Sequence, residues 1–487
     1  MFEKLNINQK ISKEDFSSEL NLIIADLVTL QYKFKSYPGS LVIIINGFYG
    51  SGVDNLVNFI SNYIDMRHVK VAAFWQETYN IKRPYYYRFW NNLPERGKSA
   101  IFLGGWYTDL IEEYVKKKIS NVEFENRLLE CEHFEKMLSH DNTIILKLWL
   151  YIDKNKQCKY LKKVGNGFRK SGKEIVEKEK WHYAEYEAIY RAAEKAIVMT
   201  DNSDASWHLV EAHNERFMKL KVLKLVHNVY KTYSSNMLIK NENNNIYIEN
   251  SQNVIEFVNP SRVLKKEEYN KKLTDYQKRI FEITWKAYDK KINSVIVFEG
   301  LDAAGKGGCI RRLTNAMDTR LYNIHQISAP SDMEKRFHYL WRFWNKIPLK
   351  GFVSVFDRSW YGRVLVERVE NFASYGEWNR AYEEINSFEH QLADDGIMIL
   401  KVWLHISPDE QLRRFNERQK LPWKKYKITD DDWLNREKWD EYEKAANEML
   451  TRTSTSLSPW IIVPANNKYY ARIEVMKHFY RSIKKRL

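Results

Sequence analysis

Short apolar runs alternate with longer segments of helical period in the second half of the chain. The run at 294–299 is rich in β-branched residues and leads through a Gly-rich turn into a helix expected from about Lys306. The segment 433–450 has apolar residues at three- and four-residue spacing and predicts another helix. The other apolar runs are 352–356, 397–404 and 460–464. This alternation predicts an α/β fold, a parallel sheet flanked by helices, whose ligands bind at the carboxyl ends of the strands.

The first half of the chain repeats this pattern. Four matches share an offset of 254 residues, namely Arg88 with Arg342, Pro94 with Pro348, Trp106 with Trp360, and Lys147 with Lys401. Two more share an offset of 253 residues, namely Gly47 with Gly300 and Trp207 with Trp460. Matches over so long a distance at a nearly constant offset predict two tandem copies of one fold unit.

An Asn-rich stretch separates the two copies. Residues 240–250 include five Asn and show no helical apolar period, which is typical of a linker or an exposed loop. A charged helix is expected at 265–291. The sequence therefore predicts a first copy at 1–240, a linker at 241–264 and a second copy at 265–487.

The composition is that of a globular, basic protein. Aromatic residues make up 14%, which argues against disorder, and three Cys exclude a disulfide framework. There is no secretory signal, and the longest aliphatic run, 41–45, is too short to span a bilayer, so we expect a cytoplasmic protein. The net charge of +15 favours a polyanionic partner, but it also fits a generally basic enzyme.

A phosphate-binding motif follows the strand at 294–299. Residues 300–307 read Gly-Leu-Asp-Ala-Ala-Gly-Lys-Gly and fit Gly-x4-Gly-Lys between a strand and a helix, with a chance Gly-rich turn as the alternative. Backbone N–H groups and the positive end of the helix dipole bind phosphate in such loops. The residues expected to line the phosphate are Gly300, Ala303, Ala304, Gly305 and Gly307. Lys306 would add a full positive charge at the transferred phosphoryl group.

Two acidic residues are candidates for a magnesium site. P-loop enzymes usually place Ser or Thr after the Lys, but Gly307 offers no hydroxyl, so a metal must use other oxygens. Asp302 lies inside the loop, and Asp357 follows the strand at 352–356, where a Walker-B acid is expected. Carboxylate oxygens suit Mg²⁺. For Asp357, an N-cap of the next helix is the alternative, and both roles can coexist.

Basic residues follow two of the predicted strands. Arg358 and Arg363 come just after Asp357 and can clamp phosphate oxygens. A later basic segment, interrupted by Pro422, contains Arg413, Arg414, Arg418, Lys420, Lys424, Lys425 and Lys427. We interpret it as a lid over phosphates rather than a solvated helix face. The acidic triplet 430–432 is expected to be the first turn of the next helix rather than a metal site.

Four segments of the second copy resemble the family-2 polyphosphate kinases, at 299–308, 356–363, 418–427 and 453–466. They include Glu-Gly-Leu-Asp-Ala-Ala-Gly-Lys-Gly-Gly and Phe-Asp-Arg-Ser-Trp-Tyr-Gly-Arg. The tandem arrangement is similar to that of the two-domain polyphosphate:AMP phosphotransferases of this family. The resemblance implies two P-loop kinase domains like thymidylate kinase, with a helical lid. It also implies Mg²⁺-dependent phosphoryl transfer from inorganic polyphosphate to AMP, giving ADP.

The same resemblance implies a role for each motif residue of the second copy. Asp302 and Asp357 would correspond to the metal and catalytic carboxylates, and Lys306 and Arg358 to the phosphate ligands. The lid would carry Arg418, Lys424 and Lys427. Gly307 is no departure, because the loop of this family also has Gly after the Lys.

The first copy lacks these chemical groups. Its replacements are Tyr49 for Asp302, Val53 for Lys306, Leu103 for Asp357 and Gly104 for Arg358. Electrostatic stabilisation of phosphoryl transfer cannot survive the loss of all four, so we expect a structural or regulatory copy without turnover. Basic residues that could still hold a polyanion are Lys159, Lys162, Lys163, Arg169, Lys170 and Lys173.

The sequence leaves other functions open. The acceptor can be ADP, giving ATP, and an ATP-dependent nucleoside monophosphate kinase shares the fold, although Gly307 and the many lid cations argue against it. A polyphosphate-binding regulator is the non-enzyme alternative, against which the intact loop, both acids and Arg358 argue. We expect no membrane partner and, without a nucleic-acid-binding motif, no nucleic acid. A homo-oligomer is compatible with the sequence.

Overall fold

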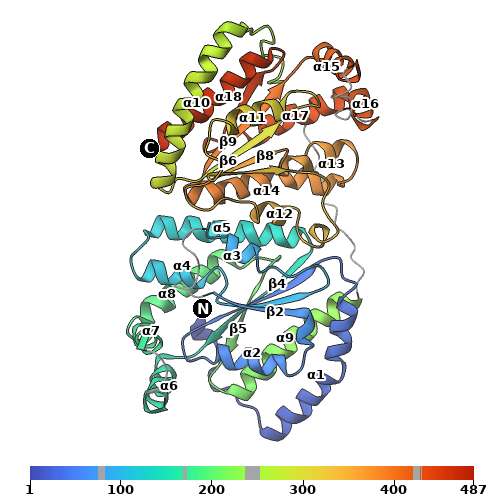
Figure 1. Cartoon of the computed structure of the whole chain (residues 1–487). Coiled ribbons are helices and arrows are strands. Elements are labelled where there is room, and N and C mark those ends of the chain that lie inside the picture. The colour runs from blue at the N-terminus through green and yellow to red at the C-terminus, as the bar shows by residue number, and fades with distance from the viewer. Residues whose placement is uncertain (75–82, 168–172, 236–252, 421–427, 429) are drawn as a thin grey trace. The chain divides into compact units, whose positions relative to one another are not determined.

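The computed structural model describes residues 1–74, 83–167, 173–235, 253–420, 428 and 430–487. The chain forms two compact units (Figure 1). The first contains residues 1–79, 88–240 and 332–338, and the second contains 80–87, 241–331 and 339–487. Each unit thus includes a short segment from the other half of the sequence. In the part of the chain described, no helix is long and apolar enough to cross a membrane.

The first unit is built on a sheet of five parallel strands in the order β2-β3-β1-β4-β5. The strands are β1 (Ser40–Gly47), β2 (Val69–Ala73), β3 (Ser99–Leu103), β4 (Thr143–Tyr151) and β5 (Trp207–Glu211). The central strand β1 is buried almost throughout, with Ile43 paired to Ile101 of β3 and Leu146 of β4. Its continuous apolar run is what a strand covered on both faces requires.

Helices cover both faces of this sheet (Figure 1). They are α1 (Lys13–Phe34), α2 (Val53–Ser61), α3 (Tyr87–Trp90), α4 (Thr108–Val115), α5 (Asn121–His140), α6 (Lys154–Gly167), α7 (Lys173–Ala184), α8 (Tyr186–Thr200) and α9 (Glu215–Ser235). Helices α1, α2 and α9 pack on one another at one face, and α4, α5 and α8 pack together at the other. The polar faces of these helices remain outward.

The second unit has the same topology, with the strand order β7-β8-β6-β9-β10. Its strands are β6 (Ser294–Glu299), β7 (Tyr322–Gln326), β8 (Val353–Asp357), β9 (Met398–His405) and β10 (Trp460–Pro464). The predicted parallel sheet is therefore confirmed, and four of its strands lie within a residue or so of the apolar runs. The pattern missed β7, because this edge strand mixes polar and apolar residues and is largely solvent-accessible.

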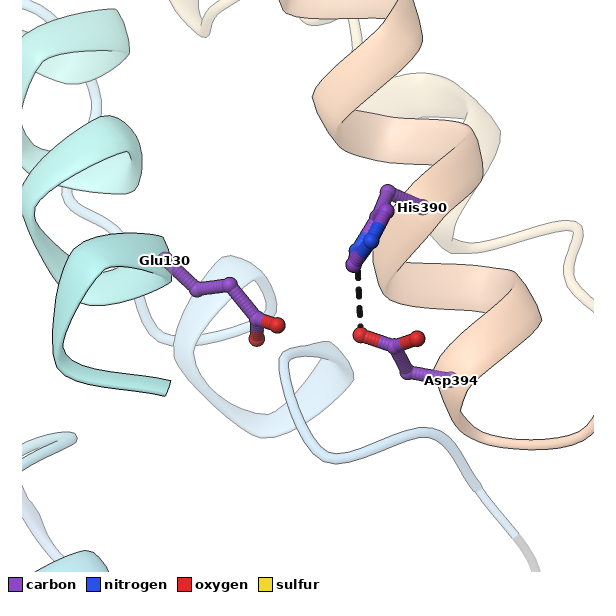
Figure 2. A group of neighbouring side chains, drawn as sticks. All are labelled: Glu130, His390 and Asp394. Atoms are coloured by element: carbon purple, nitrogen blue, oxygen red, sulfur yellow. Dashed lines mark ion pairs between the residues drawn. The ribbon is translucent and has the colours of Figure 1, made fainter. Parts of the chain in front are cut away.

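The helices of the second unit also flank both faces of its sheet (Figure 1). They are α10 (Lys266–Asp289), α11 (Lys306–Thr314), α12 (Trp341–Trp344), α13 (Val366–Val369), α14 (Tyr375–Asp394), α15 (Pro408–Lys420), α16 (Asp430–Glu437), α17 (Trp439–Thr453) and α18 (Lys468–Arg486). On α14, His390 Nδ1 lies 3.0 Å from Asp394 Oδ2, one turn away (Figure 2). Such an exposed pair stabilises its own helix modestly.

The prediction of one helix over 433–450 is wrong. The chain forms α16 and α17, separated at Lys438, whose ψ of 27° lies outside the helical range. Lys438 Nζ binds Glu370 Oε2 at 2.6 Å. The acidic triplet does form the first turn of a helix, as expected, since α16 begins at Asp430.

The predicted linker is only partly described. The Asn-rich stretch 240–250 lies outside the described residues, as does the middle of the basic segment after α15. Towards the end of the linker, Ile255 and Leu264 are buried, and Ile255 N donates to Asn447 Oδ1 at 3.0 Å. This stretch therefore packs on the second unit.

A buried ionic network recurs in the two units. In the second, Lys401 Nζ binds Glu389 Oε2 at 2.7 Å and the carbonyl of Thr453 at 2.6 Å, and Tyr361 Oη donates to Glu389 at 2.6 Å. The equivalent contacts in the first are made by Lys147, Glu135, Thr200 and Tyr107, at 2.7, 2.7 and 2.6 Å respectively. The two lysines have no exposed surface. Because both units keep the network, it belongs to the fold rather than to chemistry found in one unit.

Candidate active site

The loop between β6 and α11 has a backbone that only particular residues tolerate. Gly300 has a φ of 146°, and a Cβ there would lie 2.5 Å from the carbonyl oxygen of Leu404. Gly305, with a φ of 106°, is the N-cap of α11. The loop thus delivers the chain to the N-terminus of a helix, whose first N–H groups lack intrahelical acceptors and attract anions.

Arg414 of α15 holds this loop in shape. Its guanidinium donates to the carbonyls of Ala303 and Ala304 at 2.8 and 3.1 Å, and to those of Ala465 and Asn466 at 2.6 and 3.0 Å. The basic segment after β9 predicts a lid role for Arg414. Its Nε binds Glu410 Oε1 at 2.6 Å. Because the other donors of the guanidinium go to these backbone carbonyls, Arg414 joins the loop to the segment after β10.

Charged side chains of the loop and of β8 meet at the carboxyl edge of the sheet. Arg358 Nη2 donates to Asp302 Oδ1 at 3.0 Å, and Lys306 Nζ donates to the carbonyl of Gly300 at 2.5 Å. Burial acts to raise the pKa of Asp302, but Lys306 and Arg358 outweigh it, so the pKa of this carboxyl lies below its usual range. For Lys306, burial and then the charge of Arg358 lower the pKa of the ammonium. Asp302 is therefore ionised at neutral pH.

Glu299 is a third carboxylate at this edge, in addition to the two predicted from the motifs. It is the last residue of β6, is buried, and accepts a hydrogen bond from Ser359 Oγ at 2.8 Å. Burial raises the pKa of Glu299, against the opposing charges of Lys306 and Arg358. In the sequence, Glu299 is recognisable as a site residue by the feature that identifies Asp357, an acidic residue at the end of an otherwise apolar strand.

Arg358 lies close to three acidic side chains, and its own backbone conformation is unfavourable. Partial burial acts to lower the pKa of Arg358, but Asp302, Glu299 and Asp357 outweigh it and raise the pKa. Its φ is 62°, in the left-handed region that residues with a Cβ atom rarely adopt. Strain of this kind costs on the order of 1–3 kcal/mol and persists only where surrounding structure imposes it.

The acidic residues fit a hard divalent cation. Asp302 and Asp357 both lie near enough to Lys306 and Arg358 to shift the pKa of each. Their donors are carboxylate oxygens, which Mg²⁺ prefers. The capping role left open for Asp357 falls to Ser359, whose Oγ accepts from Tyr361 N at 3.3 Å at the start of a short 3₁₀ helix.

The remaining predicted residues lie elsewhere or are not described. Arg363 Nη1 binds Glu367 Oε2 at 3.1 Å, and its guanidinium lies over the Tyr339 ring, 4.5 Å from the centroid. Arg418 is in the last turn of α15. Lys424 and Lys427 lie outside the described residues. The structure therefore brings together Asp302, Lys306, Asp357 and Arg358, but it does not place Arg363 beside them.

Helix α4 of the first unit, which follows β3, carries ion pairs of its own. Arg88 Nη2 lies 2.5 Å from Asp109 Oδ2, and both side chains are buried. Glu112 binds Lys116 at 2.9 Å and Lys178 at 3.0 Å. Burial acts to raise the pKa of Glu112, but His182 and then the lysines lower it to about 2. These cations are satisfied internally, so they offer little to an added phosphate.

Comparisons with known proteins match both halves of the chain. The family model for polyphosphate kinase 2 (PPK2) matches residues 10–237 and 263–487. A polyphosphate:AMP phosphotransferase of Pseudomonas aeruginosa is 35% identical over 486 residues, covering 98% of this chain and 97% of that protein. One of Acinetobacter johnsonii is 33% identical over 469 residues, covering 96% and 95%.

A solved structure matches at the level of the whole fold. A crystal structure described as a polyphosphate kinase 2 from Pseudomonas aeruginosa superposes with a TM-score of 0.89 at 33% identity, covering 100% of this chain and 99% of that one. The expected tandem of two α/β kinase-like domains is thereby confirmed, as is the family resemblance seen in the second copy.

Proposed function

The chain belongs to the polyphosphate kinase 2 family, and we propose that it transfers a phosphoryl group from inorganic polyphosphate to AMP, giving ADP. The observation that carries this proposal is the meeting of Asp302, Lys306 and Arg358 at the carboxyl edge of the second sheet. Relatives that are similar over their whole length are polyphosphate:AMP phosphotransferases, which supports both the donor and the acceptor.

The proposed chemistry needs positioning and charge rather than a covalent intermediate. Asp302 and Asp357 would hold Mg²⁺, which when bound neutralises phosphate charge. The loop before α11 would bind phosphate oxygens through Gly300, Ala303, Ala304 and Gly305, and the first turn of the helix through Gly307. Lys306 would leave the Gly300 carbonyl for the transferred phosphoryl group, and Arg358 would stabilise the charge on its oxygens. Arg418, Lys424 and Lys427 would bind the remainder of the polyphosphate.

We further propose that the chemistry resides in residues 265–487 alone. The equivalent positions of the first unit hold Tyr49, Val53, Leu103 and Gly104. Asp109 and Glu112 of α4 are already paired, with Arg88 and Lys116. Residues 1–240 would then support the fold or regulate the enzyme. In this assignment Arg363 stabilises the segment after Arg358 through Glu367 rather than binding phosphate directly.

A donor and acceptor assay tests the proposal. The full chain is incubated with Mg²⁺ and long-chain polyphosphate, with AMP, ADP and GMP offered separately, and the products are resolved. We expect ADP from AMP, no product after chelation of the metal, and weaker activity as salt rises, because part of the donor affinity is screened charge. Turnover with ATP but not with polyphosphate would overturn the proposal.

A further inference from the structure

A helix of each unit contacts the loop after the first strand, and the contacts use equivalent positions. In the second unit, Asn435 of α16 donates from Nδ2 to Asp302 Oδ2 at 2.9 Å. In the first unit, the ring of His182 on α7 lies 5.2 Å from the ring of Tyr49. His182 and Tyr49 each precede their counterparts by 253 residues. The helix therefore meets the loop whether or not a carboxylate stands there.

The orientation of the Asn435 amide follows from its neighbours. An ionised carboxylate only accepts hydrogen bonds, so the side of Asn435 that faces Asp302 is its NH₂ group. The other side, Oδ1, lies 3.3 Å from the hydroxyl of Tyr442. Tyr442 also contacts Glu370 Oε1 at 3.1 Å, and Lys438 binds the other oxygen of Glu370. Tyr442 has one hydroxyl hydrogen to share between these two acceptors. The amide is thus backed by Tyr442 of α17, which Glu370, the residue after α13, also contacts.

Asp302 is held on three sides. Its Oδ1 accepts from Arg358 at 3.0 Å, and its Oδ2 accepts from Asn435. Its backbone carbonyl accepts from Gln411 Nε2 at 3.0 Å, and Gln411 Oε1 in turn accepts from Arg436 at 3.0 Å. Helix α16 therefore reaches Asp302 twice, directly through Asn435 and indirectly through Arg436.

We propose that Asn435 is a positioning residue that couples the docking of α16 to the readiness of Asp302 to bind a divalent cation. The proposal rests on the proposed function in taking Asp302 as a Mg²⁺ ligand. A carboxylate oxygen carries two lone pairs, so Oδ2 can accept from Asn435 and still coordinate a cation. A carboxylate already held in one rotamer loses less freedom on binding the metal. By linkage, the bound metal must stabilise the docked helix to the same extent.

The test compares three variants of the full chain. Asn435→Ala removes the donor, Asn435→His keeps a ring N–H at the position where the first unit has His182, and His182→Asn makes the reverse change in the first unit. The first readout is amide hydrogen exchange across 430–437. The second is Mn²⁺ binding followed by electron paramagnetic resonance, without nucleotide or polyphosphate.

We expect exchange in Asn435→Ala to be about tenfold faster and Mn²⁺ affinity to be several-fold weaker, the loss typical of one hydrogen bond to a charged group. Asn435→His should keep the exchange rate and the Mn²⁺ affinity close to those of the wild type. His182→Asn should change neither quantity. In turnover, the Mg²⁺ concentration for half-maximal rate should rise in Asn435→Ala while the KM for AMP changes little.

Wild-type exchange and wild-type Mn²⁺ binding in Asn435→Ala would overturn the proposal. So would faster exchange without weaker Mn²⁺ binding, because the contact would then be purely structural. Should Asn435→Ala fail to fold, Asn435→Leu replaces it with the same expectations. A wild-type chain that shows the coupling but does not phosphorylate AMP would refute the proposed function and leave the role of Asn435 standing.

Discussion

The loops at 47–53 and 300–306 share two left-handed backbone positions and differ in chemistry. Gly50 and Gly52 have φ of 82° and 93°, and the equivalent Ala303 and Gly305 have φ of 63° and 106°. Gln157 and Gln411 each donate at 3.0 Å to the carbonyl of the third loop residue. Yet the first loop has no lysine, acid or clamp. Loop shape is thus maintained by packing and backbone hydrogen bonds, without the charges that phosphate requires.

One neighbour explains why Gly50 cannot be Ala while position 303 can. A Cβ at Gly50 would lie 2.6 Å from the ring of Tyr160. In the second unit Tyr160 is replaced by Arg414, which instead donates to the carbonyl of Ala303. The turn therefore packs against the Tyr160 ring in the first unit, whereas in the second unit it accepts a hydrogen bond from the Arg414 guanidinium.

The two units also differ in backbone strain. Arg358 has a φ of 62°, and Gly104, with a φ of 88°, stands at the equivalent position in the first unit. Glycine adopts this region without a steric cost. The first unit, with Gly104, thus avoids a strain that the second unit maintains at Arg358 beside its acids. A strained residue that persists in this way is the pattern expected at a functional site.

The largest effect should come from the loop lysine. Lys306→Ala should lower turnover by about 10⁴-fold, because the equivalent loop of the first unit has Val53 at this position and cannot stabilise the transferred charge in its place. The reverse change in the first unit, Val53→Lys, should not rescue it, since Tyr49 and Gly104 supply neither metal ligand nor clamp. Steady-state assays of both single variants and the double variant measure this. Activity that persists in Lys306→Ala and vanishes on changing the first loop would show that the first unit is active.

Replacing the buried lysine of the ionic network should destabilise the protein by a similar amount in either unit. Lys147→Met and Lys401→Met each leave a buried glutamate without its cation, which destabilises a protein by about 3–5 kcal/mol. Denaturant unfolding of each variant measures the loss. Similar losses would show that the network serves the fold. A loss confined to Lys401→Met would instead tie the network to the unit that carries the chemistry.

The two acids should matter for turnover more than for folding. Asp302→Asn and Asp357→Asn keep the size of the side chain but remove its charge, and each should cost about 10²-fold in kcat if both position the metal. The exposed Asp409→Asn on α15 is the matched control and should leave kcat unchanged. If both site variants kept most of their activity, the proposal that two carboxylates hold the metal would be wrong.

The smallest change in folding stability should be a gain. Arg358→Gly relieves a left-handed φ and should raise the free energy of unfolding by about 1 kcal/mol while abolishing turnover. Lys291, with a φ of 60°, offers the control, because Lys291→Gly should give a similar gain with full activity. Thermal unfolding and assays measure both. A destabilised Arg358→Gly would mean that the contact with Asp302 outweighs the strain.

Local patterns predicted much of the fold. The strand at 460–464 and the helix observed at Lys266–Asp289 were recognisable because their periodicity reflects burial of one face or both. The edge strand β7 escaped, because a partly exposed strand needs no continuous apolar run. The break at Lys438 also escaped, since it accompanies a contact with Glu370, 68 residues away in sequence.

The amino-acid sequence alone determined the tandem repeat, the α/β fold, and the loop that carries Asp302 and Lys306, because each depends on residues close together in the chain or on a constant offset. Only the tertiary structure decided which distant groups join them. Arg414 proved to be a support for the loop, Glu299 a third acid beside Arg358, and Asn435 a partner of Asp302. Contacts between segments 59 to 133 residues apart depend on how helices and loops pack on the sheet, and no spacing along the chain encodes that geometry.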